Sequence, residues 1–526
     1  MLYREGQEEI LKKVIDECNK HKVVFLDAPT GAGKSFMNLM TAKNKGSGFI
    51  TTPLKLLVDQ YDDDLKNNEN YKGLGTVIKG KNAYPCLLLQ EAGVPEATAD
   101  GAICENPPKK NWSCSYKTND ECPYYVKRKL AKESNVTVTT LAYLFYGIKT
   151  GIYSGSWKQR KVLIIDEAHN IDDQLVDFYS INVGKRSFDK KLSDRIIEFN
   201  YNALNREPTL ENLQNLLNLE LKEVIELIEV IENQQDLAKL SSLKSAIVRT
   251  IEKINGNVEF LYTKFEDKHI WKPYEVKEFT KKFFDKFENV ILSSATFVSP
   301  ELLLNSIGLP NDYSVVKVKS TFPAKNSPVK LMPITKINMK NITEALPKIL
   351  NGLIKIAEAN KNTRGFIHCK TYDIRDYIYN NAPQELKIRL WKHEKYNREE
   401  TLKDWIETGD QQSIFLSVHM GEGVDLKGDL ARWQVILKTP YLYMGDKYVK
   451  AHYNAINGQK WYNQKTIIEL IQMCGRVMRA EKDWGVTYIL DSTAVGLLFG
   501  NKEMLPSWFK ERVNYVRGEI PLEFSR

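Results

Sequence analysis

The stretch VVFLDAPTGAGKS, residues 23–35, most constrains how this chain folds. Its first four residues are apolar, which is typical of a strand buried on both faces of a parallel sheet. The glycines at 31 and 33 then allow a tight turn, and Lys34 and Ser35 open a predicted helix. We therefore expect an α/β fold in which this strand leads through a turn into a helix.

The same stretch resembles a P-loop, whose backbone N–H groups surround phosphates while its lysine reaches the β- and γ-phosphates and its hydroxyl binds Mg²⁺. Ala28 stands where the general pattern has its first glycine, and an alanine there is common in superfamily 2 helicases. A chance glycine-rich turn is the alternative, but strand, motif and helix all agree. The resemblance assigns ATP and Mg²⁺ binding to Thr30, Gly31, Gly33, Lys34 and Ser35.

A second apolar run occurs in VLIIDEAHNI, residues 162–171. It predicts a buried strand that ends on acidic residues, and ligands lie beyond the carboxyl ends of such strands. A strand ending in a polar turn is common, so the stretch alone is not decisive. After a P-loop, however, DEAH resembles motif II of superfamily 2 helicases. The resemblance implies that Asp166 holds Mg²⁺, that Glu167 activates the attacking water, and that His169 links to the next motif.

Further motifs follow in that family's order. YREGQEEIL resembles the Q-motif, which would place Arg4 and Gln7 at the adenine; a solvated glutamine on an amphipathic helix is the alternative. ITTPLKLLVDQY resembles motif Ia, in which Thr51 and Thr52 would touch the DNA backbone. LSSAT, residues 292–296, resembles motif III, which couples hydrolysis to strand binding.

The C-terminal part offers a second α/β set of motifs. SIFLSVHMGEGVDLKG resembles motif V, with Glu422, Gly423 and Asp425 at the nucleotide site. IQMCGRVMRAEKDWGVTYILD resembles motif VI, whose polar residues recur one helical turn apart and so share one face. A salt-bridged surface helix is the alternative. The resemblance assigns nucleotide binding to Gln472 and Gly475, and assigns the arginine fingers that stabilise transition-state charge to Arg476 and Arg479.

Four of the seven cysteines crowd between residues 86 and 122, separated by 17, nine and seven residues. None of these gaps has the two-to-four-residue spacing typical of structural zinc. A four-cysteine cluster between motifs Ia and II resembles the XPD/DinG family of iron-sulfur helicases, where it ligates a [4Fe-4S] cluster. Zinc and unligated thiols are the alternatives. The resemblance assigns the iron-sulfur cluster to Cys86, Cys104, Cys114 and Cys122.

Two further segments fit this family. Tyr124, Lys127 and Arg128 follow the last cysteine and have basic or aromatic side chains suited to single-stranded DNA, although they could equally be ordinary surface residues. Between residues 175 and 285, leucine and isoleucine recur three and four residues apart, which predicts long helices. A coiled-coil oligomer is one explanation. The family's helical Arch domain, inserted at this place, is the other.

The resemblance implies two RecA-like P-loop lobes with two inserted domains. Lobe 1 would comprise residues 1–79, 131–174 and 286–325, the last with a linker, and lobe 2 would comprise residues 326–526. The iron-sulfur domain would be 80–130 and the Arch domain 175–285.

The implied function is an ATP-dependent 5′-to-3′ DNA helicase that binds single-stranded DNA and forked duplex DNA. One alternative is a translocase that remodels RNA, hybrids or protein–nucleic acid complexes with little unwinding. Another is a scaffold with a decayed motor, against which the intact Lys34, Glu167, Arg476 and Arg479 argue.

Charge and hydropathy agree with this interpretation without deciding it. The net charge of +8 and the isoelectric point near 8.8 suit a polyanionic partner, though excess lysine also serves solubility. No apolar run is long enough to span a bilayer, and the N-terminal MLYREGQEEILKKV carries acidic residues where a signal peptide would be basic. We expect a cytoplasmic protein.

Overall fold

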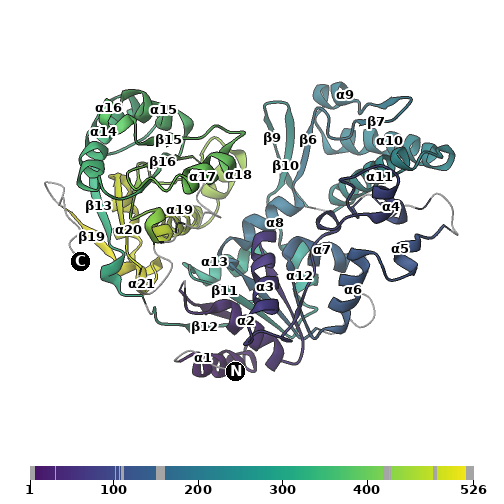
Figure 1. Ribbon diagram of the computed structural model, residues 1–526, viewed down its shortest axis with the longest axis horizontal. Helices are drawn as coiled ribbons and strands as arrows, with labels where there is room; N and C mark the ends of the chain where they lie inside the picture. The colour runs from purple at the N-terminus through teal and green to yellow at the C-terminus, as the bar shows by residue number, and fades with distance from the viewer. Residues whose placement is uncertain are drawn as a thin grey trace.

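The computed structural model describes residues 6–29, 31–100, 102–105, 107, 112–149, 160–256, 258–320, 322–418, 426, 428–477 and 483–516. Two parallel sheets of seven strands dominate it. Figure 1 shows the second sheet with its helices, in green and yellow, on one side of the first sheet, and the inserted segments on the other. We call the two sheets with their helices lobe 1 and lobe 2. The two α/β lobes predicted from the sequence are thus confirmed.

The lobe 1 sheet has a parallel register throughout. Its central strands are buried on both faces, which explains their near-continuous apolar sequences. In spatial order its strands are β12 (Tyr313–Lys317), β1 (Val23–Asp27), β11 (Asn289–Ser294), β5 (Val162–Asp166), β2 (Gly48–Thr52), β4 (Val136–Thr140) and β3 (Thr76–Val77). Its helices include α1 (Gln7–Cys18), α2 (Lys34–Asn44), α3 (Lys55–Asn67), α7 (Leu141–Lys149), α8 (Ile171–Tyr179), α12 (Lys277–Phe284) and α13 (Pro300–Ile307).

Lobe 2 repeats this design with its own apolar core on each face of the sheet. In spatial order its strands are β15 (Leu390–Lys392), β16 (Ile414–Ser417), β14 (Gly365–His368), β17 (Trp433–Ile436), β18 (Val486–Asp491), β13 (Val329–Thr335) and β19 (Val513–Tyr515). Its helices include α14 (Ile342–Ala359), α15 (Tyr372–Asn381), α17 (Arg398–Glu407), α18 (Lys447–Asn454), α19 (Gly458–Cys474) and α20 (Thr493–Gly500).

The segment between motifs II and III contains the predicted long helices, α10 (Leu210–Val230) and α11 (Gln234–Ile254). Each begins at a capping side chain, Thr209 for α10 and Asn233 for α11, which accepts hydrogen bonds from the first turn. Their leucine and isoleucine stripes pack together in one core. A paired helix therefore accounts for the stripes without a partner chain.

The same segment also holds strands that the helical periodicity did not predict. The strands β6 (Ile181–Gly184), β10 (Lys268–Pro273) and β9 (Phe260–Phe265) form an antiparallel sheet. Their alternating burial is visible in β10, but charged residues at the exposed positions hide it in the sequence. A two-stranded pair, β7 (Lys190–Lys191) with β8 (Ile196–Ile197), lies nearby in the chain. The helix α12 packs Phe283 and Phe284 into the lobe 1 core, so lobe 1 packing resumes before residue 285.

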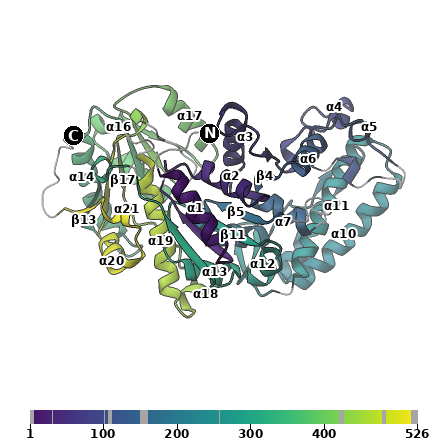
Figure 2. The same cartoon turned by 90° about the horizontal axis from the view of Figure 1, so that it is seen from below.

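The cysteine-bearing segment consists of short helices connected by turns. Three of its cysteines directly precede helices: Cys86 precedes α4 (Leu87–Glu91), Cys114 precedes α5 (Ser115–Thr118), and Cys122 precedes α6 (Pro123–Glu133). Cys104 lies in the 3₁₀ turn η2 (Ile103–Glu105). Figure 2 shows α4, α5 and α6 beside α10 and α11. Leu89 and Ile103 belong to the same apolar core as these two helices, so the two insertions support each other.

Within the described ranges, no helix has both the length and the apolar character needed to cross a membrane.

Trp405 tests the packing of lobe 2. Its ring is fully buried against Phe366 and Phe415, and the Arg364 guanidinium lies 4.2 Å from the ring centroid. We expect Trp405→Ala to lower the free energy of unfolding by about 3–5 kcal/mol, because it leaves a large cavity. Denaturant titration followed by circular dichroism measures this loss. The matched control is Leu219→Ala at a 70% exposed position, where a change within about 0.5 kcal/mol is expected. Equal stability of the two variants would contradict the packing.

Candidate active site

Three neighbouring strands of lobe 1 end at one edge of the sheet. The register pairs Asp27 of β1 with Ser294 of β11, and Ser293 of β11 with Asp166 of β5. Parallel strands that are paired in this way bring their carboxyl ends together. The glycine-rich turn, the DEAH turn and the LSSAT strand therefore meet, although more than a hundred residues separate each from the next along the chain.

The glycine-rich turn needs its glycines. Gly31 and Gly33 have φ angles of +84° and +81°, in the left-handed region that side chains disfavour. A Cβ at Gly33 would lie 2.3 Å from Nε2 of Gln7, and one at Gly31 would meet the ring of Phe322. The buried Gln7 amide donates to the Ala32 carbonyl at 3.2 Å. Gln7, the predicted Q-motif glutamine, thus stabilises the glycine-rich turn. The helix α2 begins directly after this turn, at Lys34.

Lys34 and Glu167 face each other across the two turns. The ammonium Nζ of Lys34 lies 3.5 Å from Oε1 of Glu167, with 12% and 33% of the two side chains exposed. Glu167 has a φ of +51°, so its backbone is held in the left-handed region, where a non-glycine residue is uncommon. Its own N–H donates to Oδ1 of Asp166 at 3.0 Å. The turn therefore holds both carboxylates in fixed positions at the strand end.

Asp166 is buried and belongs to a hydrogen-bond chain. The Tyr61 hydroxyl donates to Oδ2 of Asp166 at 2.9 Å, and Nδ2 of Asn38 donates to the Tyr61 oxygen at 3.1 Å. The Ser35 side chain also hydrogen-bonds to Tyr61. Burial, with a smaller contribution from the charge on Glu167, raises the pKa of Asp166 to about 6. Tyr61 thus connects the two residues predicted to bind Mg²⁺.

The sequence did not single out Tyr61 or Asn38. Tyr61 is the last residue of the stretch that resembles motif Ia, and Asn38 lies one turn into α2. A tyrosine or an asparagine at such a position is ordinarily just one residue of an amphipathic helix, so it gives no sign of a role at the site. Only the packing of α2 and α3 against β5 shows that these two polar groups reach the strand end.

His169 connects three motifs. Its Nδ1 lies 2.7 Å from Oγ of Ser294 and 3.4 Å from Oε2 of Glu167, and its Nε2 contacts the side-chain amide of Gln472. Burial lowers the pKa of His169 to about 4, so the ring is neutral near pH 7. Since the Gln472 amide N–H can only donate, Nε2 is the acceptor and Nδ1 carries the proton. The backbone N–H of Thr296 in turn donates to Ser294 at 3.1 Å.

Lobe 2 reaches this edge through α19. Gln472 lies in its last turn, and the 3₁₀ turn η7 (Gly475–Val477) that follows carries Arg476. The Arg476 side chain is buried. Two turns earlier on α19, Lys465 forms ion pairs with Asp172 and Asp173 of α8. Residues from the two lobes therefore meet at the carboxyl ends of the lobe 1 strands.

Several predicted site residues lie outside the described part of the chain. They are Arg4 of the Q-motif, Thr30 of the glycine-rich turn, Glu422, Gly423 and Asp425 of the motif V stretch, and Arg479 of motif VI.

The predicted DNA-contacting residues lie in differing environments. Thr51 and Thr52 are buried, and their hydroxyls donate to the carbonyls of Ile164 and Leu54, at 3.4 and 3.0 Å. Tyr124 is 1% exposed in the lobe 1 core, with its hydroxyl 2.9 Å from that of Tyr143. These three side chains thus pack inside the protein rather than on its surface. Lys127 and Arg128 are part-exposed; Lys127 lies 3.9 Å from Asp62, and Arg128 lies near the Tyr125 ring.

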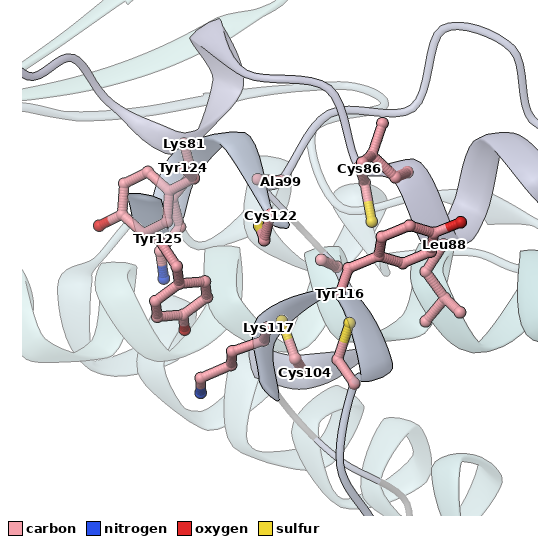
Figure 3. A pocket seen from close by; sticks show the side chains of 13 residues that line it. Lys81, Cys86, Leu88, Ala99, Cys104, Tyr116, Lys117, Cys122, Tyr124 and Tyr125 are labelled. Carbon is pink, nitrogen blue, oxygen red and sulfur yellow. The ribbon is translucent and has the colours of Figure 1, made fainter. Parts of the chain in front are cut away.

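The four clustered cysteines line one cavity, shown in Figure 3. In that view the labelled side chains of Cys86, Cys104 and Cys122 lie around a common centre. Cys86 and Cys114 are buried, and Cys104 and Cys122 are half-buried. Burial raises the pKa of Cys86, and the nearby Cys114 and Cys122 add to this. Across the described residues, no three His, Cys, Asp or Glu side chains are grouped in a way that would hold one metal ion.

Comparison with known proteins agrees with this arrangement. The family model described as "Helicase C-terminal domain" matches residues 353–512, and the one described as "DEAD_2" matches residues 108–188. The "ATP-dependent DNA helicase YoaA" of Escherichia coli (strain K12) is 24% identical over 94% of this chain and 92% of that protein. The solved structure "XPD_Helicase" superposes with a TM-score of 0.69 at 16% identity, over 98% of this chain and all of that one. In both sequence and fold the chain is thus similar to the XPD/DinG-type family of superfamily 2 helicases.

A second solved structure, "XPD_APO", superposes on this XPD/DinG-type chain with a TM-score of 0.64, also at 16% identity, over 97% of this chain and all of that one. The helicase relatives and the two helicase family models show an ATP-dependent helicase. The site just described is where sequence motifs from both lobes meet.

The ATPase assignment of this XPD/DinG-type helicase can be tested at two positions. We expect Lys34→Ala and Glu167→Gln each to lower kcat for ATP by at least about a hundredfold, because phosphate charge is no longer neutralised or water is no longer activated. Steady-state phosphate release measures both. Lys43→Ala, at an exposed position of the same helix as Lys34, is the matched control and should retain the wild-type rate. Normal turnover in either site variant would show that the site is assigned wrongly.

Proposed function

We propose that this protein is an ATP-dependent DNA helicase that moves 5′ to 3′ along single-stranded DNA and unwinds duplex or forked DNA. The observation that carries the proposal is the division of the ATPase residues between the lobes. Lys34, Asp166 and Glu167 belong to lobe 1, whereas Gln472 belongs to lobe 2 and contacts His169 at the same edge, with Arg476 four residues further along the lobe 2 chain. A motor built in this way couples hydrolysis to the approach of its lobes.

Each residue has a defined task in this mechanism. Lys34 neutralises phosphate charge, Glu167 orients and deprotonates the attacking water, and Arg476 and Arg479 stabilise the charge that develops on the γ-phosphoryl group. Ser35 and Asp166 would hold Mg²⁺, which supplies a positive charge at the phosphates when bound. The neutral ring of His169, between Ser294 and Gln472, would transmit changes at the DEAH turn to both motif III and motif VI.

We assign residues 80–130 to an iron-sulfur domain and residues 175–285 to an Arch domain. Four cysteines that line one cavity are the ligand set that a [4Fe-4S] cluster requires. A four-iron cluster is larger than a single ion, so its thiolates stand farther apart than those of zinc. Thiols that share a cavity without forming a single-ion site are consistent with this difference. When bound, the cluster would join four chain segments through iron–sulfur bonds.

The cofactor assignment predicts a brown protein. Protein purified without oxygen should contain about four irons per chain, and Cys114→Ser should remove most of the colour because one of four ligands is lost. Iron analysis and visible absorption measure both effects. Cys18→Ser, a buried thiol in α1 of lobe 1, is the matched control and should keep the iron. Stoichiometric zinc in place of iron would overturn the assignment.

The polarity assignment rests on the family, because no residue spacing shows direction. We expect the enzyme to unwind a 5′-tailed duplex and to leave matched 3′-tailed and blunt duplexes largely intact. Strand-displacement assays with ATP and Mg²⁺ at one ionic strength measure this preference. Loading should weaken steeply with salt, since counterion release contributes most of such sequence-independent affinity. A preference for the 3′ tail would refute the polarity, and efficient action only on RNA or hybrid duplexes would refute the DNA substrate.

A further inference from the structure

Lys465 connects the two lobes beside the ATPase site. Its ammonium lies 2.7 Å from Oδ2 of Asp172 and 2.7 Å from Oδ2 of Asp173. The side chain of Lys465 is 6% exposed, that of Asp172 is 9% exposed, and that of Asp173 is half-exposed. The lysine comes from α19 of lobe 2, and both carboxylates come from the first turn of α8 in lobe 1. This ion triad is therefore a buried contact between lobes.

Burial makes the triad sensitive to geometry. Burial alone would lower the pKa of Lys465, but the two carboxylates outweigh it and the net pKa lies above its usual value, so the lysine stays charged. Burial raises the pKa of Asp172, and the positive charge of Lys465 opposes that rise. Charges held in a poorly solvated place interact strongly when paired and are costly when separated. The triad thus favours one relative position of α8 and α19.

The triad and the contact between Gln472 and His169 lie along the same face of α19. Lys465 and Gln472 are seven residues apart, which is two helical turns, so they share a face about 10 Å apart along the axis. On the other side, Asp172 and Asp173 follow His169 by three and four residues. The contact between Gln472 and His169 fixes one point of α19, and the triad fixes a second. These two contacts together constrain the angle at which α19, itself packed in the lobe 2 core, approaches lobe 1.

Arg476 follows directly from this helix. It lies four residues after Gln472, in the turn η7 at the end of α19. We propose that Lys465 is a positioning residue for ATP hydrolysis, which orients α19 through Asp172 and Asp173 so that Arg476 is presented to the γ-phosphate. The inference rests on the proposed role of Arg476 and adds a structural reason for its placement. Lys465 itself does not touch the reacting atoms.

The ionisable groups of α18 beside the triad do not replace the charge of Lys465. Tyr448 and His452 of α18 lie close enough to interact with these charges. Burial raises the pKa of Tyr448 above its usual value and lowers that of His452, so both are neutral near pH 7. Loss of the Lys465 charge is therefore not compensated by a neighbouring cation among these groups.

The test compares Lys465→Met with Lys460→Met. Lys460 lies on the same helix but is exposed, so its substitution controls for loss of one lysine from α19. Lys465→Met should lower kcat for ATP by at least about tenfold, because the arginine is misplaced in the transition state. The KM for ATP should change less than about threefold, because nucleotide binding depends mainly on the lobe 1 turn. Lys460→Met should match the wild type in both constants.

Hydrogen exchange separates a positioning role from general loss of structure. In Lys465→Met, amides of α8 and α19 should exchange faster, whereas those of α14 in lobe 2 and α2 in lobe 1 should not change. Asp173→Asn provides a second variant, because its half-exposed side chain can be replaced without burying an unpaired charge. It should lower kcat in the same direction but less than Lys465→Met does.

Two results would overturn the inference. One is a kcat of Lys465→Met within about twofold of that of Lys460→Met. The other is faster exchange in α14 and α2 as well as in α8 and α19, which would mean that Lys465 only stabilises the fold. Failure of the wild type to unwind DNA would count against the proposed function instead, because the comparison of these variants uses ATP turnover and not unwinding.

Discussion

The pairing of β1, β11 and β5 is the constraint on which the rest of this structure depends. Because these strands are parallel and adjacent, the glycine-rich turn, the LSSAT segment and the DEAH turn end at one edge of the sheet. A shift of one residue would displace the end of one strand by about 3.3 Å relative to its neighbour and so separate Lys34 from Glu167. These strands are buried on both faces, so such a shift would also disrupt close packing in the two apolar cores that flank the sheet. The same strand register is therefore required both for packing of the lobe 1 core and for the geometry of the ATPase site.

The parts that sequence predicted well are those where local pattern and tertiary role coincide. The glycine-rich turn and the DEAH strand are short motifs with fixed spacing, so they predict the α/β lobes and the strand ends beside which Lys34 and Asp166 lie. The apolar stripes of α10 and α11 were equally clear. In each case the residues that make the local structure are also those that make the core or the site.

Prediction failed where a residue's role depends on distant packing. Tyr61 reads as one aromatic residue on an amphipathic helix, and only the approach of α3 to β5 makes it a donor to Asp166. Tyr124 was predicted to lie at a DNA surface because basic and aromatic neighbours surround it, yet its ring fills the lobe 1 core. The strand β10 is hidden because Lys268 and Lys272 occupy two of its less buried positions, and β9 is hidden because its residues do not alternate between buried and exposed. In each case the outcome depends on which neighbouring element covers a given face of the helix or strand. The sequence period alone does not identify that neighbour.

The shared core of the two insertions has a further consequence. Leu89 and Ile103, which flank cysteines in the chain, pack with α10 and α11 in one apolar cluster, so the cysteine segment and the helical segment form a cooperative unit rather than two independent modules. Damage at the thiols would not remain local, because loosening of η2 or α4 removes support from both long helices. Half-buried Cys104 and Cys122 are the thiols most open to oxidants. Oxidation of these thiols would therefore change the stiffness of the cysteine segment and of α10 and α11 together, although all of them lie away from the ATPase site.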